Sequence, residues 1–271
     1  MNKKFIAALI VAAIALVTLS GCGNTKADVP ASSDNIQMQT QNLPFSQYLT
    51  LTGTYPHSTS SFTQGLFFHN GQMYESVGGY SESAIYKNIF IDTGEHEKEY
   101  RFADDIFAEG SVVFNKKLYV LTWQENLVMT FSPDTLEALD SFNYPREGWG
   151  LTTDGEHLIA SDGTSHIYFM DSDLNDTKEI TVTKNGKEIN NINELEYIDG
   201  YIWANVWLSN EIIIIDKNSG EVVKTIDFSG LYTDESGDAD NVLNGIAYNH
   251  ETKKLYITGK RWDTLYEFEI K

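Results

Sequence analysis

The sequence predicts an all-β protein folded as a five-bladed β-propeller, with the ring closed by an N-terminal strand in the last blade. Two observations lead to this fold: short β-prone runs separated by tight turns, and a hairpin pattern that recurs five times. No long segment shows the apolar spacing of an amphipathic helix. Pro56, Pro133 and Pro145 fall outside the expected strand interiors, where a proline would remove a ladder hydrogen bond.

The hairpins consist of runs of Tyr, Phe, Val, Ile and Thr around Gly, Asn and Asp. Residues 66–74 read Leu-Phe-Phe-His-Asn-Gly-Gln-Met-Tyr, which is two β-prone runs joined by an Asn-Gly turn. The pattern starts at five positions that lie 40 to 51 residues apart: Gln64, Glu109, Trp149, Asn193 and Asn244. A repeat of about 40–50 residues with several strands in each unit is typical of β-propellers.

Both ends of the repeated region carry an unpaired part. Residues 47–54 read as a single strand before the first unit, and the last unit ends one strand short at Lys271. A closed ring uses both leftovers, because the N-terminal strand completes the final blade. A solenoid has the same kind of period but needs capping ends. A sandwich or another β architecture remains the alternative.

The N-terminal region reads as an export signal. Lys3 and Lys4 precede an apolar run over residues 5–19, which is shorter than the roughly 18 residues of a membrane-spanning helix. The run ends in Leu-Ser-Gly-Cys, which resembles a bacterial lipoprotein cleavage box, and Cys22 is the only cysteine. We therefore expect residues 1–21 to be a lipoprotein signal peptide and Cys22 to carry a lipid that anchors the protein to the cell membrane, outside the cytoplasm. The alternative is a signal peptide cleaved elsewhere.

The rest of the chain divides into a linker and one domain. The polar composition of residues 23–45 predicts a flexible linker after Cys22, and residues 46–271 are expected to form the propeller as one domain. The net charge of −20, with no basic cluster beyond the signal, argues against nucleic acid and anionic membrane surfaces as partners. We expect a monomer.

Repeat geometry places ten residues at one mouth of the channel. In each blade the start of the first strand lies beside the end of the second. The five starts are given above, and the five matching ends are Gly78, Trp123, Gly163, Trp207 and Lys260. A purely structural ring would repeat one residue type, whereas these ten comprise amides, indoles, glycines, one carboxylate and one ammonium. Such asymmetry indicates a site for a small asymmetric ligand. A hydrogen-bonded plug is the alternative.

Glu109 is the only carboxylate among the ten. Indole neighbours would raise its pKa by desolvation, which suits general acid/base chemistry, while Lys260 could lower the pKa again. No metal site is expected: the segment from Asp171 departs from a calcium loop at its sixth and twelfth positions, and the six histidines lack metal-ligand spacing. Calcium in the acidic stretch 234–240 stays open.

A set of ordered blocks resembles the plant and bacterial type of glutaminyl-peptide cyclotransferase, a family of five-bladed propellers. The blocks are Tyr55-Pro56-His57, Phe62-Thr63-Gln64-Gly65-Leu66, Tyr74-Glu75-Ser76, Phe107-Ala108-Glu109-Gly110, Leu121-Thr122-Trp123, Glu147-Gly148-Trp149-Gly150-Leu151-Thr152, Ser161-Asp162-Gly163-Thr164, Asn193-Glu194-Leu195-Glu196-Tyr197, Ala204-Asn205-Val206-Trp207, Leu243-Asn244-Gly245-Ile246-Ala247 and Thr258-Gly259-Lys260. They span the domain. Departures at Ala108, Asp263 and residues 58–61 remove no expected site residue.

The resemblance implies cyclisation of an N-terminal glutamine to pyroglutamate with release of ammonia, on peptides or proteins, without metal or cofactor. It implies that Glu109 acts as general acid and base, and that Asn193 and Lys260 stabilise the oxyanion. Gln64 and Asn244 would orient the substrate. A wall that excludes water would consist of Trp123, Trp149 and Trp207. The alternatives are a non-catalytic propeller that binds peptides or glycans, and a metal-dependent propeller of the lactonase kind.

Overall fold

The computed structural model describes residues 41–271. The predictions of a signal peptide, of lipidation at Cys22 and of most of the linker fall on residues outside this range. Among the described residues, no helix has the length and hydropathy that a membrane-spanning segment needs. The packed chain begins at a short 3-10 helix, η1 (Pro44–Gln47), before the expected domain start at residue 46. Phe45 belongs to the core because its ring packs against Phe228 at 5.5 Å and Phe268 at 5.3 Å.

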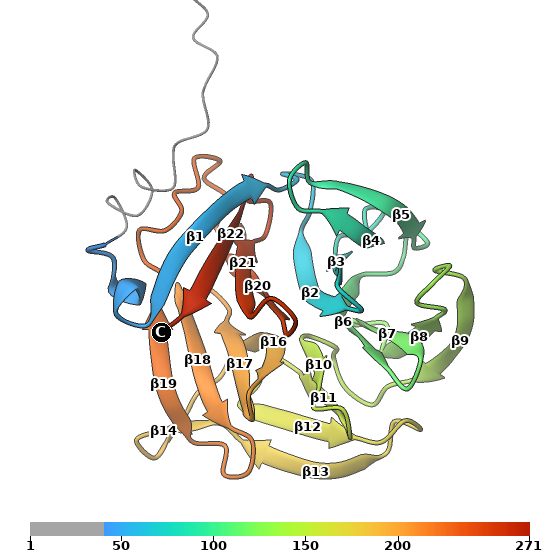
Figure 1. Ribbon diagram of the computed structural model, residues 1–271. Helices are drawn as coiled ribbons and strands as arrows, with labels where there is room; N and C mark the ends of the chain where they lie inside the picture. The colour runs from blue at the N-terminus through green and yellow to red at the C-terminus, as the bar shows by residue number, and fades with distance from the viewer. Residues whose placement is uncertain (1–40) are drawn as a thin grey trace, which may run out of the picture. The chain divides into compact units, whose positions relative to one another are not determined.

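Five antiparallel four-stranded sheets surround a central axis as the blades of a propeller, which confirms the predicted fold (Figure 1). The first blade holds β2 (Thr63–His69), β3 (Gln72–Val77), β4 (Ala84–Phe90) and β5 (Glu95–Arg101). The second holds β6 (Ala108–Phe114), β7 (Lys117–Thr122), β8 (Leu127–Phe131) and β9 (Ala138–Asn143). The third holds β10 (Leu151–Thr153), β11 (Leu158–Ser161), β12 (His166–Met170) and β13 (Asp176–Thr181). The innermost strand of each blade is the first.

The fourth blade holds β16 (Ile192–Ile198), β17 (Tyr201–Val206), β18 (Glu211–Asp216) and β19 (Val222–Asp227). The fifth holds β20 (Leu243–Asn249), β21 (Lys254–Gly259) and β22 (Thr264–Ile270), and its outer strand is β1 (Leu49–Pro56). A small hairpin that the repeat pattern did not predict, β14 (Thr183–Lys184) with β15 (Lys187–Glu188), lies between the third and fourth blades.

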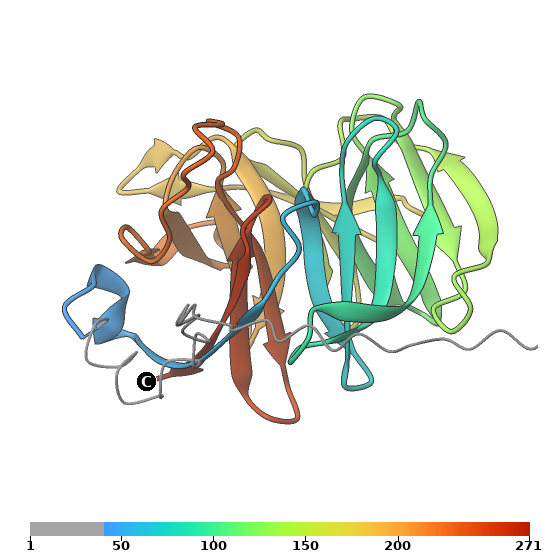
Figure 2. The same cartoon turned by 90° about the horizontal axis from the view of Figure 1, so that it is seen from above.

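The ring closes as predicted from the two leftover strands. β1 pairs antiparallel with β22, from Leu49 opposite Ile270 to Pro56 opposite Thr264. The final blade therefore joins both ends of the folded chain in one sheet. Figure 2 shows the disc from its side, with the C-terminus on the face where β20 turns into β21.

A β-bulge occurs near the start of the first strand in four of the blades. The register shifts fall across Gln64, Glu109, Asn193 and Asn244, the positions at which the hairpin pattern starts. A bulge inserts one extra residue and re-aims its side chain. In the third blade the first strand is shorter, and Trp149 precedes it. Bulges thus turn the starting side chains out of the regular pleat at the channel mouth.

Glycine after the bulge lets the innermost strands of neighbouring blades touch. The N–H of Gly110 donates to the carbonyl of Trp149 in the next blade at 2.7 Å. A Cβ at Gly110 would overlap the backbone N of Leu151, and one at Gly150 would overlap the carbonyl of Asn193. Only glycine leaves the room for backbone-to-backbone contact at these two positions.

The fourth blade carries a glutamate where its neighbours carry that glycine. Glu194 is buried, and its carboxylate accepts hydrogen bonds from the N–H of Leu66 in the first blade at 3.3 Å and of Ile246 in the fifth at 2.9 Å. Two residues further on, Glu196 accepts from the N–H of Tyr248 at 2.8 Å. Burial raises the pKa of Glu194 well above its usual range and that of Glu196 to about 8. These carboxylates tie three innermost strands together across the axis.

Candidate active site

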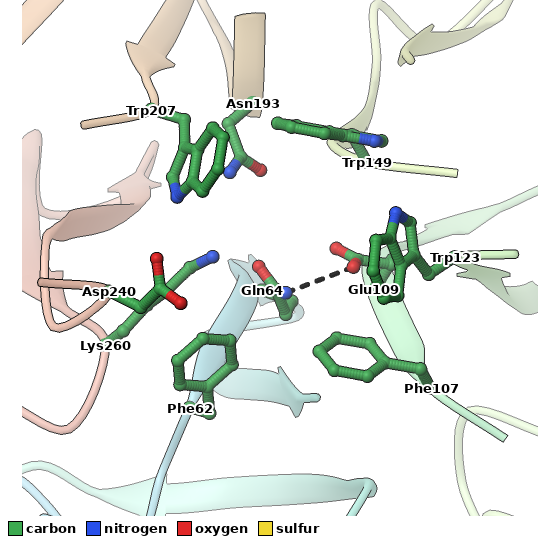
Figure 3. A pocket seen from close by; sticks show the side chains of 10 residues that line it. All are labelled: Phe62, Gln64, Phe107, Glu109, Trp123, Trp149, Asn193, Trp207, Asp240 and Lys260. Atoms are coloured by element: carbon green, nitrogen blue, oxygen red, sulfur yellow. Dashed lines mark hydrogen bonds between the residues drawn. The ribbon is translucent and has the colours of Figure 1, made fainter. Parts of the chain in front are cut away.

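A cavity of about 290 Å³ opens at the mouth of the channel, where the repeat alignment predicted a site. Its lining contains every predicted catalytic and wall residue and one of the two amides expected to orient the substrate. The lining residues are Phe62, Gln64, Phe107, Glu109, Trp123, Trp149, Asn193, Trp207, Asp240 and Lys260 (Figure 3). Asn244 is the predicted site residue that the cavity lining does not include. The cavity is polar at its base and aromatic around its wall.

Glu109 lies at the base, with 5% of its surface exposed. The side-chain amide of Gln64 donates from Nε2 to Glu109 Oε1 at 3.1 Å. The hydroxyl of Ser76 donates to the Glu109 carbonyl at 2.6 Å, which fixes the bulged backbone. Burial raises the pKa of the Glu109 carboxyl well above its usual range, and the Lys260 ammonium only partly opposes this shift. The carboxyl group therefore holds its proton more tightly than an exposed glutamate does.

Lys260 is the cation of the cavity, with 4% of its surface exposed. Figure 3 shows Lys260 and Glu109 on opposite sides, with the Gln64 side chain between them. The Lys260 Nζ lies over the Phe62 ring, 4.5 Å from its centre. Burial lowers the pKa of this ammonium group, and the charges of Glu109 and Asp240 oppose the change. Lys260 thus presents N–H donors to the cavity, and its ammonium group loses a proton more easily than that of an exposed lysine.

The two asparagines occupy different depths. Asn193 is 2% exposed and lines the cavity, and its Oδ1 has no hydrogen-bond partner within residues 41–271. Asn244 is fully buried behind Gln64, where its Nδ2 donates to the Thr63 carbonyl at 2.8 Å and to Gln64 Oε1 at 3.3 Å. Asn244 therefore orients the Gln64 amide, so that Gln64 Nε2 points at Glu109, instead of reaching the cavity itself. Asn244 does not line the cavity, and its expected role in orienting the substrate stays a prediction.

Aromatic rings form the rest of the wall. Trp207 meets Trp149 edge-to-face with ring centres 5.7 Å apart, and Trp123 meets Phe107 at 5.5 Å. Two glycines leave room for these rings, as the sequence suggested. A Cβ at Gly163 would lie 2.5 Å from the Trp149 indole, and one at Gly78 would overlap the Phe107 ring. Each of these rings thus packs on a neighbouring ring or on a bare glycine.

Comparison with known proteins assigns this chain to a family. Residues 24–270 match the family model described as glutamine cyclotransferase. The chain belongs to the glutamine cyclotransferase family. This membership confirms the resemblance found in the sequence and makes the chain an enzyme of the glutaminyl-peptide cyclotransferase class.

Two relatives support the membership in this cyclotransferase family. A glutaminyl-peptide cyclotransferase of Arabidopsis thaliana is 35% identical over 229 residues, which are 82% of this chain and 71% of the plant protein. The crystal structure of Myxococcus xanthus glutaminyl cyclase is similar with a TM-score of 0.74 and 33% identity, covering 82% of this chain and 96% of that one. The second match also agrees with the five-bladed fold.

Three lining residues of this cyclotransferase were absent from the predicted site. Phe62 and Phe107 each lie two residues before a bulge position, Gln64 and Glu109, so the repeat alignment held a signal for both. Asp240 comes from the loop of residues 228–242, which has no counterpart of its length in the other blades. No symmetry argument can place a residue of that loop.

The cavity lining supplies a carboxyl group of raised pKa, an ammonium group, two amides and a wall of aromatic rings. Within the described part of the chain, no group of three or more His, Cys, Asp or Glu side chains is placed to hold a metal ion. The segment at Asp171 forms a turn in which Asp171 Oδ1 accepts from the N–H of Asp173 at 2.9 Å and of Asn175 at 3.0 Å. The groups that line the cavity could exchange a proton and stabilise charge.

Proposed function

We propose that this cyclotransferase converts the N-terminal glutamine of peptides and proteins to pyroglutamate by metal-independent acid/base catalysis at Glu109. The observation that carries the proposal is a buried carboxyl of raised pKa, held by Gln64, in a cavity that also contains the Lys260 ammonium. The cavity volume of about 290 Å³ suits a small side chain rather than a long peptide segment. The rest of the peptide would leave through the mouth.

Ring closure begins when the neutral α-amine attacks the side-chain amide carbon of the same glutamine. The new C–N bond leaves an excess proton on the amine nitrogen, and the Glu109 carboxylate takes it. A general base works best when its pKa lies near the working pH, and burial moves Glu109 in that direction. The product of this step is a tetrahedral intermediate with a negative oxygen.

The intermediate collapses by losing the amide nitrogen. The protonated Glu109 carboxyl returns its proton to that nitrogen, the C–N bond breaks, and ammonia leaves. The oxyanion becomes the lactam carbonyl, and Glu109 is again a carboxylate. One carboxyl group thus serves as base and then as acid, and no net proton enters or leaves the cycle.

The negative oxygen needs fixed donors on the opposite side of the cavity from Glu109. The proposed donors are Lys260 Nζ, which lies across the cavity from Glu109, and Asn193 Nδ2, whose side chain lies between Trp207 and Trp149. Preorganised donors in a site without water stabilise developing charge more than water does. The unpartnered Asn193 Oδ1 would accept an N–H from the substrate amide or amine, which would satisfy a buried acceptor.

The remaining residues hold the substrate. Gln64 keeps the Glu109 carboxyl in one orientation, and Asn244 keeps Gln64 in place. Three indoles, Trp123, Trp149 and Trp207, would press the glutamine side chain into the curled conformation in which amine and amide carbon meet. Holding the reacting atoms in that geometry removes part of the entropic barrier.

We also propose that the enzyme acts outside the cytoplasm as a monomer, anchored to the membrane by a lipid on Cys22. The export signal of residues 1–21 and the lone cysteine support this setting, with residues 22–45 as linker and residues 46–271 as the catalytic domain. Exported peptides and proteins with N-terminal glutamine would be the substrates, and nucleic acid would not be a partner. Cys22→Ser should move the protein from the membrane fraction to the soluble fraction.

The decisive experiment incubates the purified protein with a peptide that begins with glutamine. We expect ammonia release and a pyroglutamyl product by mass spectrometry, with turnover that survives a chelator. Glu109→Gln should lose roughly 10²- to 10⁴-fold in kcat, the usual contribution of a positioned acid/base, with unfolding temperature unchanged. Full activity in Glu109→Gln would sink the assigned role. A folded wild type without turnover on several such peptides would favour a binding propeller, and chelator sensitivity would favour metal chemistry.

A further inference from the structure

Two indoles of the aromatic wall, Trp123 and Trp149, are linked by a carboxylate instead of by a contact between their rings. Trp207 packs on Trp149, and Trp123 packs on Phe107, but within residues 41–271 no ring pair joins Trp149 to Trp123. The carboxylate of Glu147 links these two indoles. Glu147 Oε2 accepts a hydrogen bond from Trp123 Nε1 at 3.0 Å and another from Trp149 Nε1 at 3.2 Å.

The backbone around Glu147 is built to hold it there. The next residue is Gly148, whose N–H donates to the Thr122 carbonyl at the end of β7 at 3.0 Å. A Cβ at position 148 would lie 2.5 Å from the Leu121 Cβ, so the segment can approach β7 only as glycine. Glu147 is thereby fixed between the end of the second blade and the start of the third, outside the cavity lining.

We propose that Glu147 is a positioning residue for the cyclisation, because it sets the orientation of the two indoles that close the wall between the second and third blades. The proposal rests on the proposed function, since the wall matters only if it holds a curled substrate. The proton transfers do not pass through Glu147, although its negative charge, with that of Glu125, helps to raise the pKa of Glu109. Its role is carried by Trp123 and Trp149.

Physical chemistry explains why one carboxylate can do this. An indole has a single N–H, and the torsion that turns its ring is broad, so packing alone leaves the ring free to rock. A hydrogen bond from that N–H to a charged acceptor fixes the ring and is about twice as strong as a neutral one. Both N–H groups point at the same oxygen of Glu147, so the two rings are fixed relative to each other.

Two substitutions at Glu147 distinguish the loss of its negative charge from the loss of its hydrogen-bond acceptor. Glu147→Gln keeps a carbonyl oxygen that can accept both N–H groups, whereas Glu147→Leu has a similar size and accepts neither. We expect Glu147→Gln to keep kcat/KM within about threefold of wild type. We expect Glu147→Leu to lose roughly 10- to 100-fold, with a higher KM and a lower kcat, since small misplacements in an active site cost that much.

An independent readout follows the indoles directly. The chain has five tryptophans, so the ¹⁵N-labelled protein gives five indole N–H signals. In Glu147→Leu the two signals of Trp123 and Trp149, assigned with Trp123→Phe and Trp149→Phe, should move while those of Trp203 and Trp262 stay. Gln124→Ala is the matched control. It removes the donor to the other Glu147 oxygen, 3.4 Å away, from an exposed side chain outside the cavity, and should change neither turnover nor signals.

The outcomes divide cleanly. The positioning role is overturned if folded Glu147→Leu keeps wild-type kcat/KM, if Glu147→Gln loses as much as Glu147→Leu, or if the two indole signals do not move. Should Glu147→Leu fail to fold, Glu147→Ala carries the same expectations because it also lacks an acceptor. A wild type without turnover would refute the proposed function, and the indole signals would still decide whether Glu147 fixes both rings.

Discussion

Gln64 holds Glu109 through a hydrogen bond of 3.1 Å from its Nε2, while its own Oε1 accepts from Asn244 at 3.3 Å. The bond to Asn244 determines which end of the Gln64 amide faces Glu109, because only Oε1 can accept from the Asn244 Nδ2. Three successive side chains, from the fifth, first and second blades, therefore form one line that ends at the proposed acid/base. Through this line the orientation of the Glu109 carboxyl depends on Asn244, which does not line the cavity.

Asn244→Ala should reduce kcat more than it changes KM. The substitution removes the bond that orients Gln64, so the Gln64 amide can turn and present an acceptor to Glu109. Losing one such bond costs about 1 kcal/mol, which corresponds to a roughly fivefold lower rate, with a similar loss of stability from the unpaired Thr63 carbonyl. Steady-state kinetics at saturating substrate measure the change, and thermal unfolding controls for folding. An unchanged kcat in the folded variant would contradict the line from Asn244 to Glu109.

Glu125→Gln should move the acid limb of the pH–rate profile to lower pH. The negative charge of Glu125 helps to raise the pKa of Glu109, although Glu125 does not line the cavity. Glu109 must be ionised to accept the first proton. Removing a nearby negative charge lowers the pKa of Glu109, so its ionised form persists to lower pH. The measurement is kcat/KM against pH at low salt. High salt, which screens exposed charges, should shrink the difference between the two proteins, and a shift to higher pH would refute the assignment of Glu109 as the base.

Gly163→Ala should impair catalysis, whereas Gly155→Ala should affect only stability. Both glycines have a left-handed backbone, with φ of +78° at Gly163 and +87° at Gly155. A Cβ at Gly163 meets the Trp149 ring at 2.5 Å, whereas one at Gly155 has nothing within 4 Å. The strain of about 1 kcal/mol from the positive φ is thus common to both, and only Gly163→Ala displaces the wall. We expect a KM increase of roughly tenfold for Gly163→Ala alone. Equal KM values in the two variants would show that the glycine does not serve the indole.

Glu196→Gln should stabilise the fold above neutral pH. Burial raises the pKa of Glu196 from 4.5 to about 8, so the folded state holds a proton that the unfolded state releases. Stability from this group is full below the unfolded pKa and falls as pH rises through the window from 4.5 to about 8. A glutamine keeps an acceptor for the Tyr248 N–H and does not ionise. The gain should be on the order of a few kcal/mol at the upper end of the window and absent at its acid end. Denaturant unfolding across pH measures it, and a parallel pH dependence in both proteins would contradict the prediction.

Most of the residues at the channel mouth could be predicted from the sequence. In a propeller, equivalent positions of the repeat lie at the same end of the channel. The starts of the five hairpins predicted that Gln64, Glu109 and Asn193 lie at the mouth, although the bulges that orient these side chains were not predicted. The repeat does not show how deep each side chain lies in the channel. Asn244 follows the same rule as Asn193, yet it lies behind Gln64, because its amide bonds to the backbone of Thr63.

Other residues stayed hidden for different physical reasons. Asp240 reaches the cavity from a loop whose path depends on tertiary contacts, such as the stacking of Tyr232 on Trp262 at 4.3 Å. Glu147 lies in one of the sequence blocks that resemble the family. Its link to the wall depends on the folded structure, in which two indoles from different blades donate to one of its oxygens. Glu194 resembles a surface residue in the sequence, although it bonds across the axis to two other blades.

The pairing of β1 with β22 also decides which way the enzyme faces. Pro56 leads through a short loop to β2 on the mouth side, so Leu49, at the other end of β1, lies on the far side of the disc. The tether proposed above would then reach the disc on the side away from the cavity. If Cys22 fastens that tether to a membrane, the cavity looks outward, and the N-terminus of a large folded protein can approach it without meeting the lipid surface.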